Sequence, residues 1–115
     1  MPGSIGGVGG PGGIFTDVNQ PDESHVVVPG ETATISLDAG DHRSQRWKVL
    51  NKPEGLDIRE HMERDPTMPS GVKTVYSLVA DESLSGRACV VDFGLMRRGE
   101  EQPASRYSAE LFVYA

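Results

Sequence analysis

Few side chains in the sequence have the chemistry for catalysis or metal binding, and their spacing favours neither. The histidines are His25, His42 and His61, and none has a second His or Cys at the spacing of a metal site. Asp57 and His61 are four residues apart, but charged surface segments often contain such pairs, so we interpret them as solvated. The single cysteine, Cys89, lies in an apolar run, where a small buried side chain is expected. The sequence therefore predicts a structural cysteine, no metal site and no cofactor.

No set of residues typical of a hydrolase is present either. The chain lacks the G-x-S-x-G motif that holds a strained nucleophilic serine. Glu100 and Glu101 lie in a segment bounded by Gly and Pro, where we expect them to keep a hairpin tip soluble. A glycosidase pair would instead need two carboxylates from different elements that face one cleft. We therefore expect no catalytic residues and no enzymatic activity.

The best candidate for a functional segment is a polar stretch beside the only tryptophan. Residues 41–46, DHRSQR, are six consecutive polar or charged residues, and Trp47 follows them directly. At the head of a strand, Trp47 is expected to pack in the core. The alternative is a partly exposed ring that contacts a partner beside the loop. Arg43 and Arg46 are either solvated or part of a binding surface, because arginine is enriched at interface hot spots.

Length and charge argue against several classes of function. The 115 residues suit one domain, and 37% hydrophobic with 24% charged residues is typical of a soluble globular protein. The formal net charge of −6 and the scattered Lys and Arg argue against a nucleic-acid partner. No apolar run reaches the length of about 18 residues that a membrane span needs. The start of the chain has no features of a secretory signal, and one cysteine leaves the compartment open.

The beginning of the chain differs in composition from the rest. Residues 1–13 hold seven of the 14 glycines and few apolar side chains to offset the entropy of ordering. The stretch GGVGGPGG has the spacing of a phosphate-binding loop, but no strand precedes it and no helix follows it. We therefore predict a flexible Gly-rich leader over residues 1–20 and one folded domain over residues 21–115.

The rest of the chain has the two-residue period of half-buried strands. Six runs alternate apolar and polar residues between Gly, Pro, Asp and Ser, which predicts an all-β antiparallel sandwich or barrel. Residues 55–64 alone are ambiguous between a turn of helix and a brief strand at residues 56–58. The predicted inward faces are Ala33, Ile35 and Leu37; Trp47 and Val49; Tyr76, Leu78 and Ala80; Cys89, Val91, Phe93 and Leu95; and Tyr107, Ala109, Leu111 and Val113.

Three segments between these runs stand out by length and polarity. They are residues 38–46, 63–73 and 96–106. In a sandwich built of hairpins, alternate connections emerge at the same end. We therefore expect the three to lie together, as binding loops on rigid sandwiches often do.

The order of these features resembles the chagasin family of cysteine-protease inhibitors over about residues 24–115. The matching stretches are VVVPGETATISLDA, the polar loop with Trp47, EGL, VYSLVADESLSGRACVVDFGLMR and RYSAELFVYA. Trp47 falls where a tryptophan follows the family's first loop, and Arg97 where an arginine opens its third. Ser70 and Gly71 are a loose counterpart of its Gly-rich middle loop. The resemblance implies a disulfide-free, immunoglobulin-like β-sandwich that inhibits papain-like peptidases by inserting three loops from one end into the active-site cleft.

The first loop carries different side chains from those of the family. Where the family typically has Asn-Pro-Thr-Thr-Gly-Phe, residues 40–45 are GDHRSQ, which is bulkier and charged and suits a different enzyme cleft or partner. We predict a non-enzymatic, monomeric protein-binding module, most simply an inhibitor of a papain-like cysteine peptidase. The alternative is a structural or accessory immunoglobulin-like domain of a surface or phage-type assembly. The predicted contact residues are His42, Arg43, Ser44, Gln45, Met68, Ser70, Gly71, Arg97 and Arg98.

Overall fold

The computed structural model describes residues 20–114, which form seven strands and one short 3-10 helix. The predicted leader, apart from Gln20, lies outside the described residues, as does Ala115. Within residues 20–114 no helix is long and apolar enough to cross a membrane. The strands are β1 (Glu23–Val27), β2 (Thr32–Asp38), β3 (Gln45–Asn51), β4 (Leu56–Arg64), β5 (Val72–Ala80), β6 (Ala88–Arg97) and β7 (Ser105–Val113), and the 3-10 helix η1 spans Glu82–Leu84.

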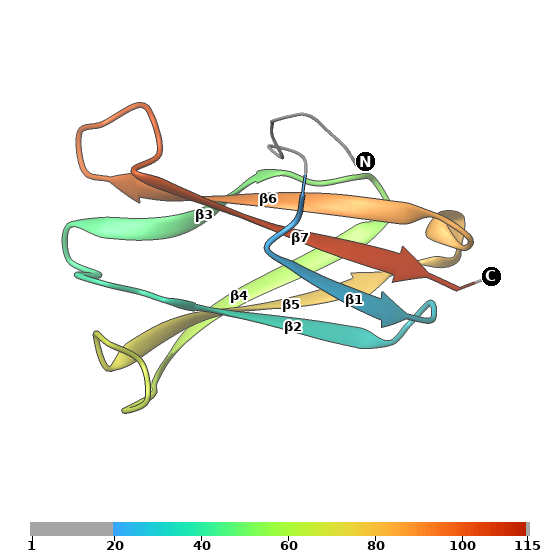
Figure 1. Ribbon diagram of the computed structural model, residues 1–115, viewed down its shortest axis with the longest axis horizontal. Coiled ribbons are helices and arrows are strands. Elements are labelled where there is room, and N and C mark those ends of the chain that lie inside the picture. Colours follow the sequence, from blue (N-terminus) through green and yellow to red (C-terminus); the bar gives the residue numbers. More distant parts are fainter. Residues whose placement is uncertain (1–19, 115) are drawn as a thin grey trace, which may run out of the picture.

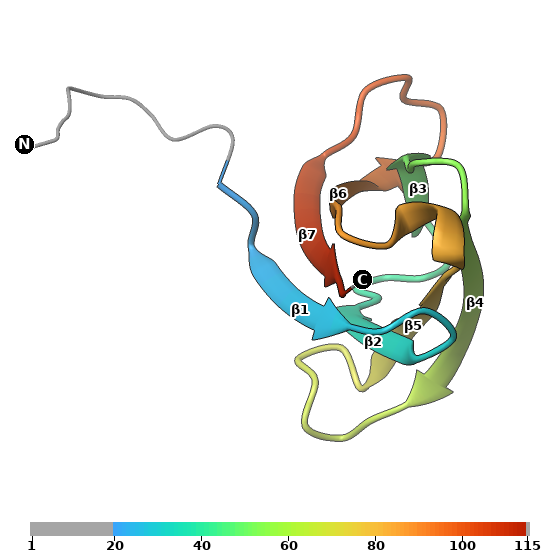
Figure 2. The ribbon, with the colours of Figure 1, turned by 90° about the vertical axis from the view of Figure 1, so that its right-hand side faces the viewer.

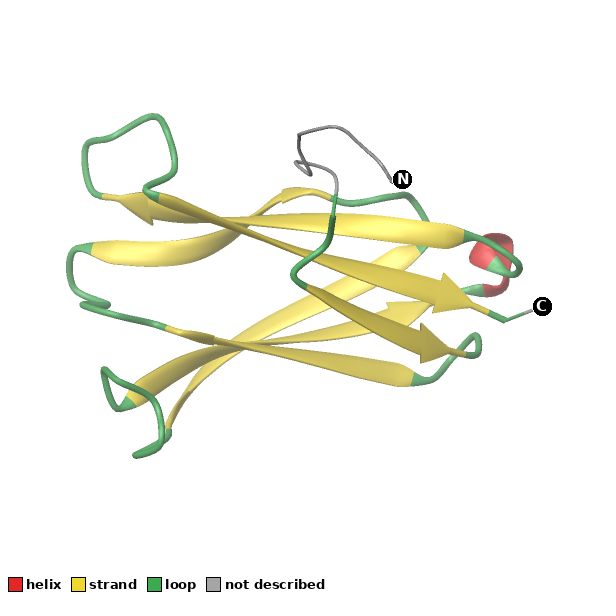
Figure 3. Cartoon of the chain, viewed as in Figure 1, coloured by secondary structure: helices red, strands yellow, loops and turns green. Residues whose placement is uncertain are grey.

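The strands form two sheets that face each other (Figures 1 and 3). One sheet has the order β1-β7-β6-β3 and the other the order β2-β5-β4. Seen from the end of the sandwich, β1 lies beside β2 at one edge and β3 lies beside β4 at the other (Figure 2). All neighbouring strands are antiparallel except β1 and β7, which run parallel. The predicted all-β immunoglobulin-like sandwich is confirmed, with this one parallel pair as the departure from an antiparallel fold.

The core lies between the two sheets and contains the side chains that the alternation placed inward, except Leu95, which is half-buried outside it. The rings of Tyr76 and Phe93, from opposite sheets, lie at its centre with their centroids 4.6 Å apart. Trp47, Val49 and Tyr107 are partly buried and pack against this core. The other predicted residues that are buried are Ala33, Ile35, Leu37, Leu78, Ala80, Cys89, Val91, Ala109, Leu111 and Val113.

The ambiguous segment is a nine-residue strand, so the helical alternative was wrong. It forms β4, which pairs with β5 from Leu56↔Ala80 to Arg64↔Val72. Leu56 is buried and Ile58 is half-buried, but every residue from Arg59 to Arg64 is exposed. The charged residues of this segment therefore lie on an edge strand. The hydrogen bonds of this strand to β5 outweigh any local preference for a helix.

Three polar connections emerge at one end of the sandwich, at the left of Figure 1. The first connection is residues 39–44, the second is residues 65–71 and the third is residues 98–104. Each is shorter than the sequence suggested because the strands extend further. Gln45 and Arg97, for example, are paired residues at the ends of β3 and β6. The turn between β1 and β2 and the helix η1 lie at the opposite end.

Replacing the central ring should cost far more stability than replacing a ring on the outer face. We expect Phe93→Ala to lower the free energy of unfolding by roughly 3–5 kcal/mol, because the ring is fully buried and its loss leaves a cavity. The matched control is Phe112→Ala, since Phe112 lies on β7 with 47% of its surface exposed. Urea denaturation of both variants measures the difference. Equal losses would contradict the position of the core.

Candidate functional site

The first connection is closed by hydrogen bonds to Asp41. The backbone carbonyl of Asp41 accepts the amides of Ser44 at 2.9 Å and Gln45 at 3.0 Å. Its carboxylate accepts the Arg43 amide at 3.2 Å and the Ser44 hydroxyl at 3.1 Å. Gly40 has a φ of +63°, and a Cβ there would lie 2.1 Å from Gln45 Nε2. The tight turn therefore requires glycine at position 40, and it fixes the backbone that carries His42 and Arg43.

Asp38, at the end of β2, ties the first connection to its neighbours. Its backbone carbonyl accepts the indole N–H of Trp47 at 2.8 Å. Its carboxylate Oδ1 accepts the Ser70 amide at 3.0 Å and the Ser70 hydroxyl at 2.6 Å. The bond from Trp47 spans nine positions and the two bonds from Ser70 span 32, so Asp38 joins β3 and the second connection to the start of the first.

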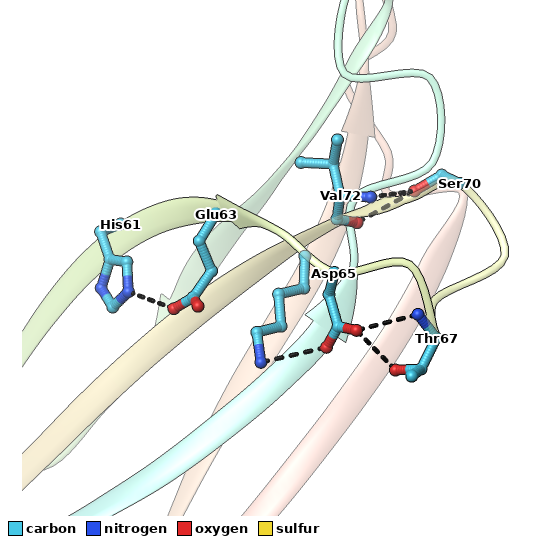
Figure 4. A network of polar contacts seen from close by, with 7 residues as sticks. His61, Glu63, Asp65, Thr67, Ser70 and Val72 are labelled. Atoms are coloured by element: carbon cyan, nitrogen blue, oxygen red, sulfur yellow. Dashed lines mark hydrogen bonds and ion pairs between the residues drawn. The ribbon is translucent and has the colours of Figure 1, made fainter.

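Asp65 organises the second connection (Figure 4). Its Oδ1 accepts the backbone amide of Thr67 at 2.9 Å and the Thr67 hydroxyl at 2.6 Å, and its Oδ2 lies 3.1 Å from Lys73 Nζ. The bonds from Thr67, followed by that from Lys73, lower the pKa of Asp65 to about 2. Its backbone amide also donates to the carbonyl of Gly71 at 2.9 Å, which closes the loop. The loop is therefore held by an ionised carboxylate.

The third connection is attached to the first through the backbone. The Arg98 amide donates to the carbonyl of Ser44 at 2.9 Å. Beside this bond, Arg97 Nε donates to Gln45 Oε1 at 3.5 Å. The Ala104 amide donates to the carbonyl of Leu95 at 2.8 Å and closes the base of the loop. The three connections are thus joined in series, from the second to the first and from the first to the third.

A groove of about 590 Å³ lies beside the first and third connections. One wall is β3 with the first connection, and another is the end of β6 with Arg98. Strand β4 of the opposite sheet contributes Glu60, whose Oε2 lies 3.4 Å from Arg46 Nη2. The groove therefore lies at the open edge of the sandwich, where β3 and β4 face each other (Figure 2).

Six of the nine predicted contact residues line this groove. They are His42, Arg43, Ser44, Gln45, Arg97 and Arg98. The other three, Met68, Ser70 and Gly71, belong to the second connection and do not line it; Ser70 is instead bound to Asp38. That any of the nine contacts a partner stays a prediction.

The groove also contains residues that the sequence did not single out as a site. Lys48 and Met96 line it, as does Glu60, which the sequence left in an ambiguous segment. The alternation in QRWKVL did place Lys48 on the face opposite Trp47, and this was the one available signal. Trp47 is partly buried, packs against the core and also lines the groove; that it contacts a partner stays a prediction.

Cys89, Asp57 and His61, the groups that the sequence raised as candidates for chemistry, do not form one site. Cys89 is buried, and burial raises the pKa of its thiol, as expected for a structural cysteine. His61 pairs with Glu63 at 2.8 Å, and Asp57 pairs with Arg59 at 3.3 Å, so Asp57 and His61 do not act together. Among residues 20–114 no group of three or more His, Cys, Asp or Glu side chains could hold a metal ion.

Comparison with solved structures assigns the scaffold. No family model and no curated protein matches the sequence. The cysteine protease inhibitor EhICP2 from Entamoeba histolytica matches with a TM-score of 0.58 and 11% identity, over 82% of this chain and 99% of that chain. The scaffold is chagasin-like. Amebosin, solved in solution, matches with a TM-score of 0.59 and 20% identity, over 81% of this chain and 90% of that chain. At these identities the likeness shows the fold alone.

Removing the Asp38 carboxylate should release the second connection without unfolding the sandwich. Asp38→Ala deletes the acceptor of both Ser70 donors, and we expect a loss of about 1 kcal/mol with faster exchange of the Ser70 amide. Asp38→Asn keeps an acceptor oxygen and should lie close to the wild type. Hydrogen exchange followed by NMR distinguishes the two. Unchanged exchange at Ser70 in Asp38→Ala would refute this role for Asp38.

The second connection should loosen at low pH. Because the pKa of Asp65 falls from 3.8 to about 2 on folding, the ionised carboxylate stabilises the loop fully above pH 3.8. This contribution disappears as the pH falls through about 2. NMR should record a matching titration of the Asp65 carboxyl and a loss of protection at the Thr67 amide. In Asp65→Ala, which has no acceptor oxygen, the protection of Thr67 should be low throughout and independent of pH in this window.

Proposed function

We propose that this chain is a non-enzymatic protein-binding module that inhibits a peptidase by placing its three connections in the active-site cleft. The observation that carries the proposal is that these connections lie at one end and are joined by the bonds that Ser70 donates to Asp38 and that the Arg98 amide donates to Ser44. Loops already fixed in place lose little conformational entropy on binding, which favours tight blockade of a cleft.

The class of target follows from the shared fold. One protein of this fold, EhICP2, is a cysteine protease inhibitor, so papain-like cysteine peptidases are the first targets to test. The large polar side chain of His42 and the charged side chain of Arg43 suit a cleft different from one that receives small residues and glycine. The target therefore has to be sought in a panel that extends beyond papain-like enzymes.

A second function is supported by the outer face of the four-stranded sheet. Val26 is paired with Phe112, and both side chains are about half exposed, at 58% and 47%. Tyr114 beyond the end of β7 is 64% exposed and Val90 on β6 is 45% exposed. Such an exposed apolar row is typical of a docking face, as an accessory domain of a larger assembly would have. Strong self-association or co-assembly without inhibition would favour this second function.

Inhibition should depend on the shape of the first connection. We expect the purified protein to inhibit at least one peptidase from a panel of cysteine, serine and metallopeptidases, and Gly40→Ala to weaken that inhibition by about tenfold or more. The reason is that Ala strains the backbone at the positive φ of +63° and its Cβ displaces the Gln45 side chain, which accepts a bond from Arg97. The control is Gly30→Ala, which has a similar positive φ of +89° but open space around its Cβ, at the opposite end of the sandwich.

Two outcomes would overturn the proposal. No inhibition of any class at micromolar concentration would remove the inhibitor function. Equal inhibition by Gly40→Ala and the wild type would show that the first connection does not enter the cleft.

A further inference from the structure

The groove beside β3 carries a charge opposite to that of the whole protein. The formal net charge of the chain is −6, yet five of its eleven Lys and Arg residues line this one groove. They are Arg43, Arg46, Lys48, Arg97 and Arg98. Among the residues that line it, Glu60 is the one carboxylate.

Most of this positive charge is not neutralised within the described part of the chain. Arg46 pairs with Glu60 at 3.4 Å, and its side chain is still 72% exposed. Among residues 20–114, the other four cations of the groove form no ion pair with a carboxylate. The contact between Arg46 and Glu60 shows that the groove accepts a carboxylate, and a weak exposed pair of this kind is readily exchanged.

The same groove has an apolar side and an unpaired strand edge. Trp47, Val49 and Met96 line it together with the cations. Strand β3 pairs with β6 on one side and is the last strand of its sheet on the other. An extended polypeptide can bind beside such an edge through its main chain, with alternate side chains in contact with the groove.

The ends of the groove limit what it can hold. Asp41, Glu100 and Glu101 lie in the same first and third connections, close to the cationic residues in sequence. The continuous phosphates of a nucleic acid would meet these carboxylates and the overall negative charge. A short segment with carboxylates spaced by apolar residues brings fewer negative charges near them, and its apolar side chains use the surface of Trp47.

We propose that the groove formed by β3, the first connection and the end of β6 binds an extended acidic segment of the partner protein. The proposal rests on the proposed function, because the first and third connections also form part of the binding end. It adds the chemistry of the partner: an acidic segment beside the cleft, whose carboxylates contact Arg46 and Arg97 and whose apolar side chains cover Trp47.

Direct binding of a peptide probe tests the groove without any peptidase. The probe is a fluorescein-labelled peptide of sequence Glu-Leu-Glu-Gly-Glu-Leu-Glu, with Lys in place of every Glu as the control peptide. We expect saturable binding of the acidic probe by fluorescence anisotropy, weakened by added salt, and no binding of the Lys peptide. Binding of both peptides alike would overturn the proposal, as would tighter binding of a single-stranded oligothymidylate.

Variants with opposite expected directions assign the binding to the groove. Arg46→Glu and Arg97→Glu should each weaken binding of the acidic probe by about tenfold. Glu60→Gln should strengthen it several-fold, because it removes the carboxylate that competes for Arg46. Arg59→Glu is the matched control, since Arg59 is a highly exposed side chain of β4 outside the groove lining and should leave the affinity unchanged. Equal weakening by Arg59→Glu would mean that only net charge matters and would contradict the site.

The two proposals can fail separately. If the acidic probe binds but no peptidase is inhibited, the groove proposal is supported and the inhibitor function is contradicted. If the protein does not bind the acidic probe, and Arg46→Glu and Arg97→Glu inhibit as well as the wild type, the inhibitor function is supported and the groove proposal is contradicted.

Discussion

The end of the sandwich that carries the three connections depends on Asp38. The first connection passes from the three-stranded sheet to the four-stranded sheet, and the bond from the Trp47 indole to the carbonyl of Asp38 holds the two sheets at that crossing. The carboxylate of the same residue holds the second connection through Ser70. The indole thus satisfies its one donor while its ring packs against the core. A single residue therefore couples the packing of the core to the positions of two loops, and the Arg98 amide extends this order to the third.

The parts of the fold that the sequence predicted are those that local periodicity determines. Ile35 and Leu37 alternate with polar residues, and both are buried; Phe93 follows the same rule at the centre of the core. The alternation predicts which face of a strand points inward, because successive side chains of a strand point to opposite sides. It could also place Trp47 at the head of a strand. It could not predict the bond to Asp38, because that bond depends on how two sheets are stacked.

The features that the sequence left open depend on partners that are distant in the chain. Strand β4 has Leu56, Ile58 and Met62 as its apolar signal, and Met62 is exposed with its neighbours because the strand lies at an edge. The parallel pairing of β1 with β7 joins residues about 86 positions apart, such as Glu23 and Ala109, and leaves no local pattern. The groove has the same origin. Arg46 and Glu60 come from different sheets, so their contact is visible only once β3 and β4 face each other.

Along β4 the side chains change from buried and apolar to exposed and polar. This change explains how the chain can keep the scaffold although its loop residues differ from those of the family. Its inward positions are apolar at Leu56 and Ile58, which lie toward the end with η1, and become Glu60 toward the end with the three connections. The apolar core therefore stops before the binding end, where Glu60 instead contacts Arg46 across the open edge. Substitutions at exposed positions outside a core generally cost little stability, so the side chains at this end can follow the requirements of a partner. The turn at Gly40 and the bonds from Asp38 concern the backbone and the base of the loops, and they hold the first connection in place whichever side chains it presents.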